Sequence, residues 1–114
     1  MKIKSVLLIR VSSSVDKDVE HPQFFDPPYA LKCLQAGLDR HPGLKAHLLD
    51  CWIRPKSVPE LLDYTSAVQP DMVVVSASSF DIDVSDSYVM KLRARPTPPL
   101  IIGIGQGFYH HRDR

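Results

Sequence analysis

Small residues follow three apolar runs of this sequence, at the points where β-strands would end. Serine hydroxyls can hydrogen-bond a ribose or a phosphate, and glycines let backbone N–H donors come close to a ligand. The residues concerned are Ser12, Ser76, Ser78, Ser79, Gly103 and Gly105. Because open α/β sheets bind their ligands at the carboxyl ends of the strands, these residues mark the edge where we expect a site.

The same residues also have simpler interpretations. Polar residues terminate buried strands whether or not a ligand is present, and this explains the serines at 76, 78 and 79 equally well. The glycines at 103, 105 and 107 fit a tight turn, and their spacing departs from the Gly-x-Gly-x-x-Gly of dinucleotide-binding proteins. Four carboxylates fall near the expected site, but no basic or nucleophilic partner is placed beside them, so no catalytic residue is predicted. They are Asp26, Asp50, Asp81 and Asp83, of which Asp50 is expected to cap or hydrogen-bond a neighbouring loop.

Histidines and cysteines form no metal or redox motif in this chain. Cys33 and Cys51 have a spacing that matches neither kind of motif, which predicts two buried thiols in a reducing cytoplasm. His21 lies in an acidic stretch and His110-His111 lies close to residue 114, so solvated side chains are a simpler interpretation than metal ligands. We therefore predict no metal site.

Composition limits the classes of partner. The 114 residues are enough for one domain, and 14 basic against 13 acidic residues give a formal charge of +1. No broad basic field is available to hold nucleic acid or an anionic membrane. Apolar residues make up 44% of the chain but form no long uninterrupted run, which excludes a membrane span. The apolar stretch after Met1 is too short for a secretory signal.

Apolar periodicity predicts four strands that alternate with three helices. The central strand contains Met72-Val73-Val74-Val75, in which three β-branched residues in a row indicate burial on both faces. Ser57 and Glu60 form a capping box at the start of the second helix, and Gln69-Pro70-Asp71 should end it. The predicted strands are Ser5 to Val11, Leu44 to Cys51, the run within Pro70 to Ser79, and Leu100 to Ile102. The predicted helices are Pro28 to Asp39, the one after Ser57, and a third with Val84, Tyr88, Val89 and Leu92 buried and Lys91, Arg93 and Arg95 at its solvated end.

This alternation predicts an α/β fold. A parallel sheet with right-handed crossovers follows, and we expect a three-layer flavodoxin-like (Rossmann-like) arrangement with strand order 2-1-3-4. Such sheets usually continue with a further helix and a fifth strand. We therefore expect residues 1–114 to be a single domain, truncated before those elements and forming the N-terminal part of a larger enzyme.

Several motifs in sequence order resemble a known family. They are Pro27-Pro28-x-x-Leu31, Gly43 ahead of a strand ending in Asp50, Ser57-x-x-Glu60, Pro70-Asp71-x-Val73-x-x-Ser76, and Ile101-Ile102-Gly103. Together they cover about residues 5 to 107 and are similar to the cobalamin-binding domain that precedes the radical domain in many radical S-adenosylmethionine enzymes. The Pro-Pro-x-x-Leu helix start and the Pro-Asp-x-Val-x-x-Ser strand are the most specific parts.

The resemblance implies a corrinoid at the carboxyl edge of the sheet. It places Ser76, Ser78, Gly103 and Gly105 beside the nucleotide tail of cobalamin, with Ser12 and Ser79 on the same edge. Two features of the family are missing. The Asp-x-His-x-x-Gly motif that supplies a histidine to cobalt is absent, and the adjacent glycine pair after the fourth strand reads Gly103-Ile104-Gly105.

The resemblance also implies a partner domain. The Cys-x-x-x-Cys-x-x-Cys that holds a [4Fe-4S] cluster is absent here, so this chain cannot cleave S-adenosylmethionine by itself. A downstream radical domain would do so, while this domain positions the corrinoid for methyl transfer, hydroxylation or ring closure.

Two other functions stay open. The domain could be a degenerate form without cofactor that docks on the radical domain or gates its substrate, as the missing cobalt ligand and broken glycine pair would favour. Ser12-Ser13-Ser14 could instead cradle a flavin phosphate in a flavodoxin-like electron carrier, although phosphate sites use a helix N-terminus and the helix here starts only at Pro28. A phospho-accepting receiver domain lacks its acidic residues, because Arg10 and Ser76 occupy those places.

Overall fold

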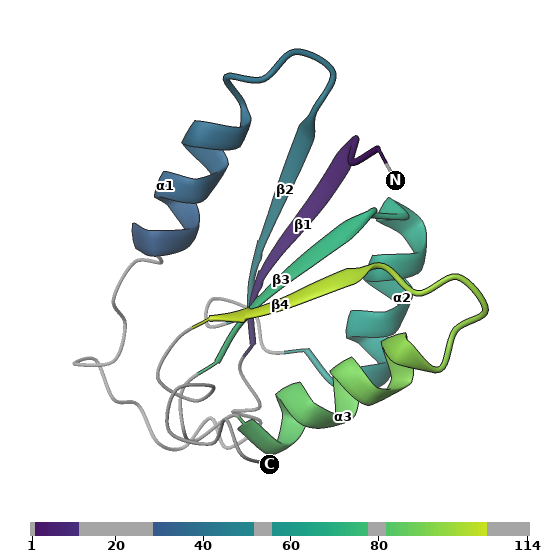
Figure 1. Ribbon diagram of the computed structural model, residues 1–114. Coiled ribbons are helices and arrows are strands. Elements are labelled where there is room, and N and C mark those ends of the chain that lie inside the picture. Colours follow the sequence, from purple (N-terminus) through teal and green to yellow (C-terminus); the bar gives the residue numbers. More distant parts are fainter. Residues whose placement is uncertain (1, 12–28, 52–55, 78–81, 105–114) are drawn as a thin grey trace.

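The computed structural model describes residues 2–11, 29–51, 56–77 and 82–104, which form four strands and three helices (Figure 1). In chain order the elements are β1 (Ser5–Arg10), α1 (Tyr29–Leu38), β2 (Lys45–Asp50), α2 (Val58–Val68), β3 (Met72–Ser76), α3 (Ile82–Arg93) and β4 (Leu100–Ile104). The alternation of strand and helix expected from the periodicity is confirmed. Among the described helices, none has the length and apolar character needed to cross a membrane.

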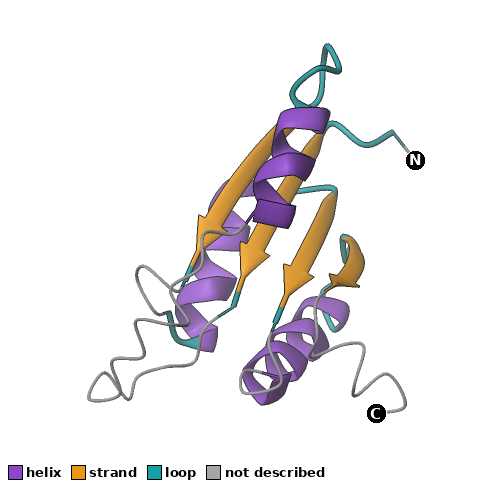
Figure 2. Cartoon of the chain, turned by 90° about the vertical axis from the view of Figure 1, so that its left-hand side faces the viewer, coloured by secondary structure: helices purple, strands orange, loops and turns teal. Residues whose placement is uncertain are grey.

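All four strands run in the same direction in one sheet. The order is β2-β1-β3-β4, and each neighbouring pair is parallel (Figure 2). Helix α1 covers one face of the sheet, whereas α2 and α3 cover the other (Figure 1). This is the three-layer, flavodoxin-like α/β architecture with the predicted order 2-1-3-4.

The inner strands β1 and β3 are buried on both faces. Leu7, Ile9, Val73 and Val75 pack towards α2 and α3 with Tyr88, and all are inaccessible to solvent. The residues between them along each strand pack towards α1 because side chains of a strand alternate between faces. They are Val6, Leu8 and Val74, which meet Leu31 of α1. Two-sided burial explains why both strands read as continuous apolar runs rather than as alternating ones.

Helix α2 begins and ends as its sequence indicates. The Ser57 hydroxyl accepts a hydrogen bond from the Glu60 N–H, and the Glu60 carboxylate accepts one from the Ser57 N–H, which is the predicted capping box. The helix ends at Gln69, whose φ of 52° is left-handed and whose N–H donates to the Thr65 carbonyl. Pro70 then prevents the helix from continuing.

Asp71 joins three strands at the amino edge of the sheet. Its Oδ2 accepts the backbone N–H groups of Lys4 (2.8 Å) and Ser5 (3.0 Å), at the start of β1. Its own N–H donates to the Ser5 carbonyl, and its carbonyl accepts the N–H of Leu100. These hydrogen bonds fix the start of β1 and β4 relative to β3.

Helices α2 and α3 are held together by polar contacts as well as apolar ones. The Tyr88 hydroxyl and Thr65 Oγ1 share a buried hydrogen bond, and Thr65 Oγ1 also donates to the Leu61 carbonyl at 2.7 Å. The Arg95 guanidinium donates to the Leu62 carbonyl and to the Ser66 hydroxyl. The prediction that Arg95 belongs to a solvated helix end was therefore wrong, because its charge lies against α2.

Two further expectations are corrected. Strand β4 continues through Ile104, so Gly103 lies inside a strand and not in the predicted turn; the Ile104 carbonyl still accepts the Ala77 N–H, at 3.4 Å. Cys51 is buried as predicted, but Cys33 is exposed. Cys33 is two residues from Leu31, the buried residue of α1, and two residues turn a helix to its opposite side.

Replacing Asp71 with asparagine should make the fold less sensitive to acid. The backbone N–H groups of Lys4 and Ser5 hold the pKa of Asp71 below its ordinary value. A lowered folded-state pKa means that this carboxylate stabilises the fold above about pH 4 and that the effect is lost as the pH falls through the folded-state pKa. Urea unfolding at several pH values should show Asp71→Asn less stable than the wild type at pH 7. The difference should shrink below pH 4, and a difference that stays constant with pH would contradict this role.

Replacing Tyr88 with phenylalanine should change stability in the alkaline range. Burial raises the pKa of Tyr88 to about 12, with the Thr65 hydrogen bond acting in the opposite direction. Above about pH 10 the unfolded chain loses this proton first, so wild-type stability should fall by about 1.4 kcal/mol per pH unit through this group. Tyr88→Phe should be about 1 kcal/mol less stable at pH 7 and lack this fall. Parallel stability profiles between pH 7 and 11 would refute the assignment.

Candidate functional site

A row of residues crosses the carboxyl edge of the sheet on the face that α1 covers. Asp50 of β2 is in register with Arg10 of β1, Arg10 with Ser76 of β3, and Ser76 with Ile104 of β4. Their side chains share a face because each lies an even number of residues from a neighbour that packs towards α1, such as Leu8 or Val74. The last residue of each inner strand is thus polar, while the residues before it are apolar.

Arg10 and Asp50 form a two-pronged ion pair within this row. Arg10 Nε donates to Asp50 Oδ1 and an η nitrogen of Arg10 donates to Asp50 Oδ2, both at 2.8 Å. The two side chains are only 14% and 9% exposed. Parallel, charge-assisted bonds of this kind are the strongest hydrogen bonds in proteins and hold the guanidinium plane in a fixed orientation. The pair therefore presents a fixed cationic group next to Ser76.

Ser76 and Gly103 are the predicted site residues that the structure describes. They lie on the neighbouring strands β3 and β4, as expected, with Ser76 half-buried and Gly103 exposed. Gly103 is in register with Val75, which faces α2 and α3, so its position belongs to the face opposite Ser76. Strand pairing brings the two residues to one edge, but alternation separates them between its two faces. The remaining predicted residues, Ser12, Ser78, Ser79 and Gly105, lie outside the described residues.

The sequence prediction did not include Arg10 as a site residue, and it assigned Asp50 to a loop contact. The structure instead gives Asp50 a basic partner on the adjacent strand. One signal could have identified this pair. Each residue is the charged end of a predicted strand, and strand order 2-1 places those two ends side by side.

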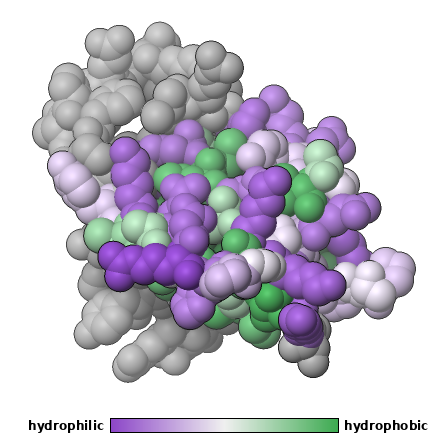
Figure 3. All heavy atoms as spheres, turned by 90° about the horizontal axis from the view of Figure 1, so that it is seen from above, coloured by the Kyte–Doolittle hydropathy of each residue, from purple (hydrophilic) through white to green (hydrophobic). Residues whose placement is uncertain are grey.

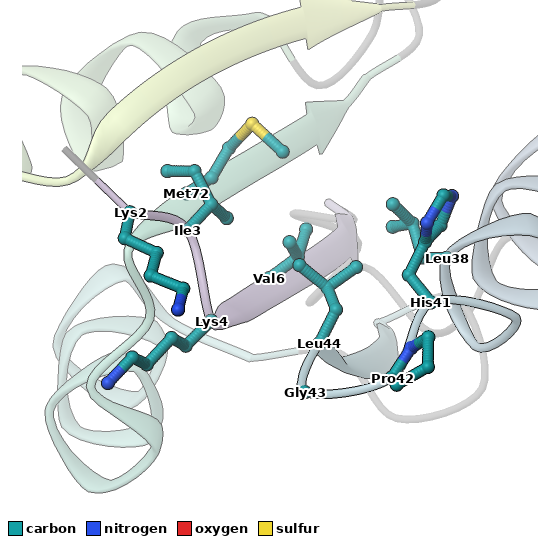
Figure 4. Close-up of a pocket in the computed structure, with 10 residues that line it drawn as sticks. All are labelled: Lys2, Ile3, Lys4, Val6, Leu38, His41, Pro42, Gly43, Leu44 and Met72. Atoms are coloured by element: carbon teal, nitrogen blue, oxygen red, sulfur yellow. The ribbon is translucent and has the colours of Figure 1, made fainter.

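Hollows on the surface lie at the other end of the strands. One of about 680 Å³ is formed by the start of β1, Met72 and the turn between α1 and β2 (Figure 4). Ile3, Val6, Leu38 and Leu44 make it largely apolar, and Lys2, Lys4 and His41 lie around it. Seen from that end of the sheet, apolar residues form separate patches between hydrophilic ones (Figure 3). A second hollow, of about 620 Å³, lies between Gln69-Pro70-Asp71 and Pro96–Pro99, also at the amino edge.

The chemistry available at the carboxyl edge is hydrogen bonding to an anion or a hydroxyl group. Arg10 supplies a positive charge and Ser76 a hydroxyl that can donate or accept. Within the described ranges, His, Cys, Asp and Glu side chains nowhere gather in a group of three that could hold a metal ion. The described part of the site thus offers binding groups and no nucleophile paired with a base.

Comparisons with known proteins do not identify a family for this chain. No family model matches it, and no match was found among the curated proteins or the solved structures. Strand order and the polar row at the carboxyl edge are therefore the basis for a functional hypothesis.

The Arg10–Asp50 pair should show strong energetic coupling. Asp50→Ala removes the carboxylate from a guanidinium that is largely buried, and we expect a loss of about 3 kcal/mol in the free energy of unfolding. The double variant Arg10→Met/Asp50→Leu removes both charges and should recover most of that loss. Urea unfolding of the wild type, both single variants and the double variant measures the coupling. Additive effects would show that the pair contributes nothing as a pair.

Proposed function

We propose that this domain binds a corrinoid across the carboxyl edge of its sheet. One observation carries the proposal: Arg10 and Ser76 lie in register at the ends of β1 and β3. In a 2-1-3-4 sheet the chain order reverses between these two strands, and ligands of open α/β sheets bind outside that point. The polar row therefore occupies the place where this architecture binds cofactors.

The residues present fit the nucleotide tail of cobalamin. A phosphate or ribose would be held by the Ser76 hydroxyl, with the Arg10 guanidinium adding positive charge nearby. Gly103 keeps the neighbouring strand free of a side chain at the same edge. When bound, the corrinoid supplies methyl-transfer or radical chemistry at cobalt, whereas the protein binds and orients it.

The proposal extends to a larger enzyme. The motifs from Pro27 to Gly103 resemble cobalamin-binding domains that precede a radical S-adenosylmethionine domain. On that basis the iron–sulfur cluster and S-adenosylmethionine belong to another domain, and this one is not catalytic alone. Reading the coding sequence beyond codon 114 for Cys-x-x-x-Cys-x-x-Cys tests this part of the proposal. A continuous reading frame without that motif would contradict it.

A second candidate is a docking domain that binds no cofactor. Two observations favour it. Asp50 already engages the Arg10 guanidinium through two nitrogens, which reduces what Arg10 can offer a phosphate. The described hollows lie at the amino edge, away from Ser76. In this role the domain would contact or gate a radical domain through its surface.

Titration with hydroxocobalamin distinguishes the two candidates. Binding should change the visible spectrum, and the corrinoid should remain with the protein on gel filtration. Ser76→Ala should weaken binding about tenfold, because a hydrogen bond to a charged group contributes roughly 1.5 kcal/mol. Ser66→Ala, an exposed serine of α2 near the other end of the sheet, is the matched control and should leave the dissociation constant unchanged.

Each other outcome has a defined meaning. No spectral change and no retention by the wild type would eliminate the corrinoid and leave the docking function. Equal effects of Ser76→Ala and Ser66→Ala would remove Ser76 from the site. Binding of flavin mononucleotide in place of the corrinoid would support the electron-carrier alternative.

A further inference from the structure

The two edges of the sheet differ in how they are protected from other strands. Edge strand β2 carries Lys45, His47 and Asp50, and charged residues on an edge oppose pairing with another strand. The Gln35 side chain of α1 also donates to the Ala46 carbonyl, at 3.5 Å. The Lys45 N–H bonds to β1, so the groups of Ala46 face away from the sheet and Gln35 covers part of that edge.

Edge strand β4 has none of these protections. Leu100–Ile104 contains no charged residue and no proline. Leu100 is 50% and Ile102 40% exposed, and Gly103 is exposed as well. An uncharged edge strand with exposed apolar side chains is the kind that recruits another strand.

The direction of the backbone groups of β4 follows from its hydrogen bonds to β3. The Leu100 N–H donates to the Asp71 carbonyl at 3.0 Å, and the Ile104 carbonyl accepts the Ala77 N–H. The N–H and C=O groups of one residue point to the same side of a parallel strand, and successive residues alternate. Leu100, Ile102 and Ile104 therefore face β3. The backbone groups of Ile101 and Gly103 point out of the sheet.

We propose that β4 pairs antiparallel with β4 of a second copy of this chain, with a twofold axis at Ile102. Ile101 and the partner's Gly103 then form a hydrogen-bonded pair, and symmetry gives Gly103 the same bond to the partner's Ile101. Ile102 lies directly opposite the partner's Ile102 in a non-hydrogen-bonded pair, where side chains come closest. The result is one continuous sheet of eight strands, counted as twice the four of one chain.

A second copy fits this edge because the register is self-complementary. Isologous contact requires that residue i meets residue j and j meets i, and the outward groups at 101 and 103 meet this condition about residue 102. The same pairing sets Leu100 opposite the partner's Ile104 on the face that α1 covers. Apolar side chains that are exposed in one copy gain apolar neighbours in two, and no charges oppose each other.

The area of contact indicates a weak dimer. Two five-residue strands bury less than the roughly 1,200–2,000 Å² of stable interfaces. We expect a dissociation constant on the order of 100 μM, which makes the association dependent on protein concentration. The inference does not depend on the corrinoid proposal, because β4 pairs through its outer edge and not through Ser76.

Sedimentation velocity from about 1 μM to about 1 mM tests the proposal. The 12.8 kDa chain should shift from monomer to dimer over this range. Ile102→Lys and Ile102→Glu place like charges face to face at the twofold axis, and each should raise the dissociation constant at least tenfold. A mixture of the two variants should recover association, because opposite charges then meet. Met90→Lys is the matched control, since Met90 is 69% exposed on α3, and should dimerise like the wild type.

Amide hydrogen exchange provides an independent measurement. The N–H groups of Ile101 and Gly103 should become protected as the concentration rises, while that of Ile102 should not change. Gly103→Pro removes one outward donor without removing a side chain, and proline is accepted on an edge strand whose N–H faces outward. A wild type that stays monomeric throughout, or variants at 102 that fold and still dimerise, would overturn the inference. Loss of association in Met90→Lys would also overturn it, because the contact would then lie on α3.

Discussion

Burial of β1 and β3 on both faces is the constraint on which the rest of this structure depends. Val6 to Ile9 and Val73 to Val75 have almost no contact with solvent, so helices must cover both sides of the sheet. Connecting two parallel strands requires a crossover, and the crossovers provide those helices. The strand order and the three layers both follow from this requirement.

The same constraint confines polar chemistry to the ends of the strands. A charge within β1 or β3 would lie between two apolar layers at a large cost, so the first polar residues appear where the strands leave the core. At the amino edge, Asp71 uses its carboxylate on backbone N–H groups and fixes the start of the sheet. At the carboxyl edge, Arg10 and Ser76 lie in register beside the point where chain order reverses. One end of the sheet is thus committed to structure, and the other offers groups to a ligand.

The outer strands are under weaker constraint, and they differ. Half-burial of β2 allows charged residues, whereas β4 remains apolar although Leu100 and Ile102 are exposed. Only Ile101 of β4 is packed against the core between the sheet and α3. A domain that binds its ligand at the carboxyl edge and a partner along β4 would keep these two surfaces separate, since strand ends and strand edges present different backbone groups.

The sequence by itself determined the elements and their order, because apolar runs, the Ser57–Glu60 box and Gln69-Pro70 act through neighbouring residues. Strand order was also predictable, since four strands joined by three helices leave few arrangements. Only the tertiary structure decided which strand ends meet, and therefore that Asp50 pairs with Arg10. It alone placed Gly103 within β4, exposed Cys33 and bound Arg95 to α2. Each of these depends on contacts between residues distant in sequence, which local patterns do not encode.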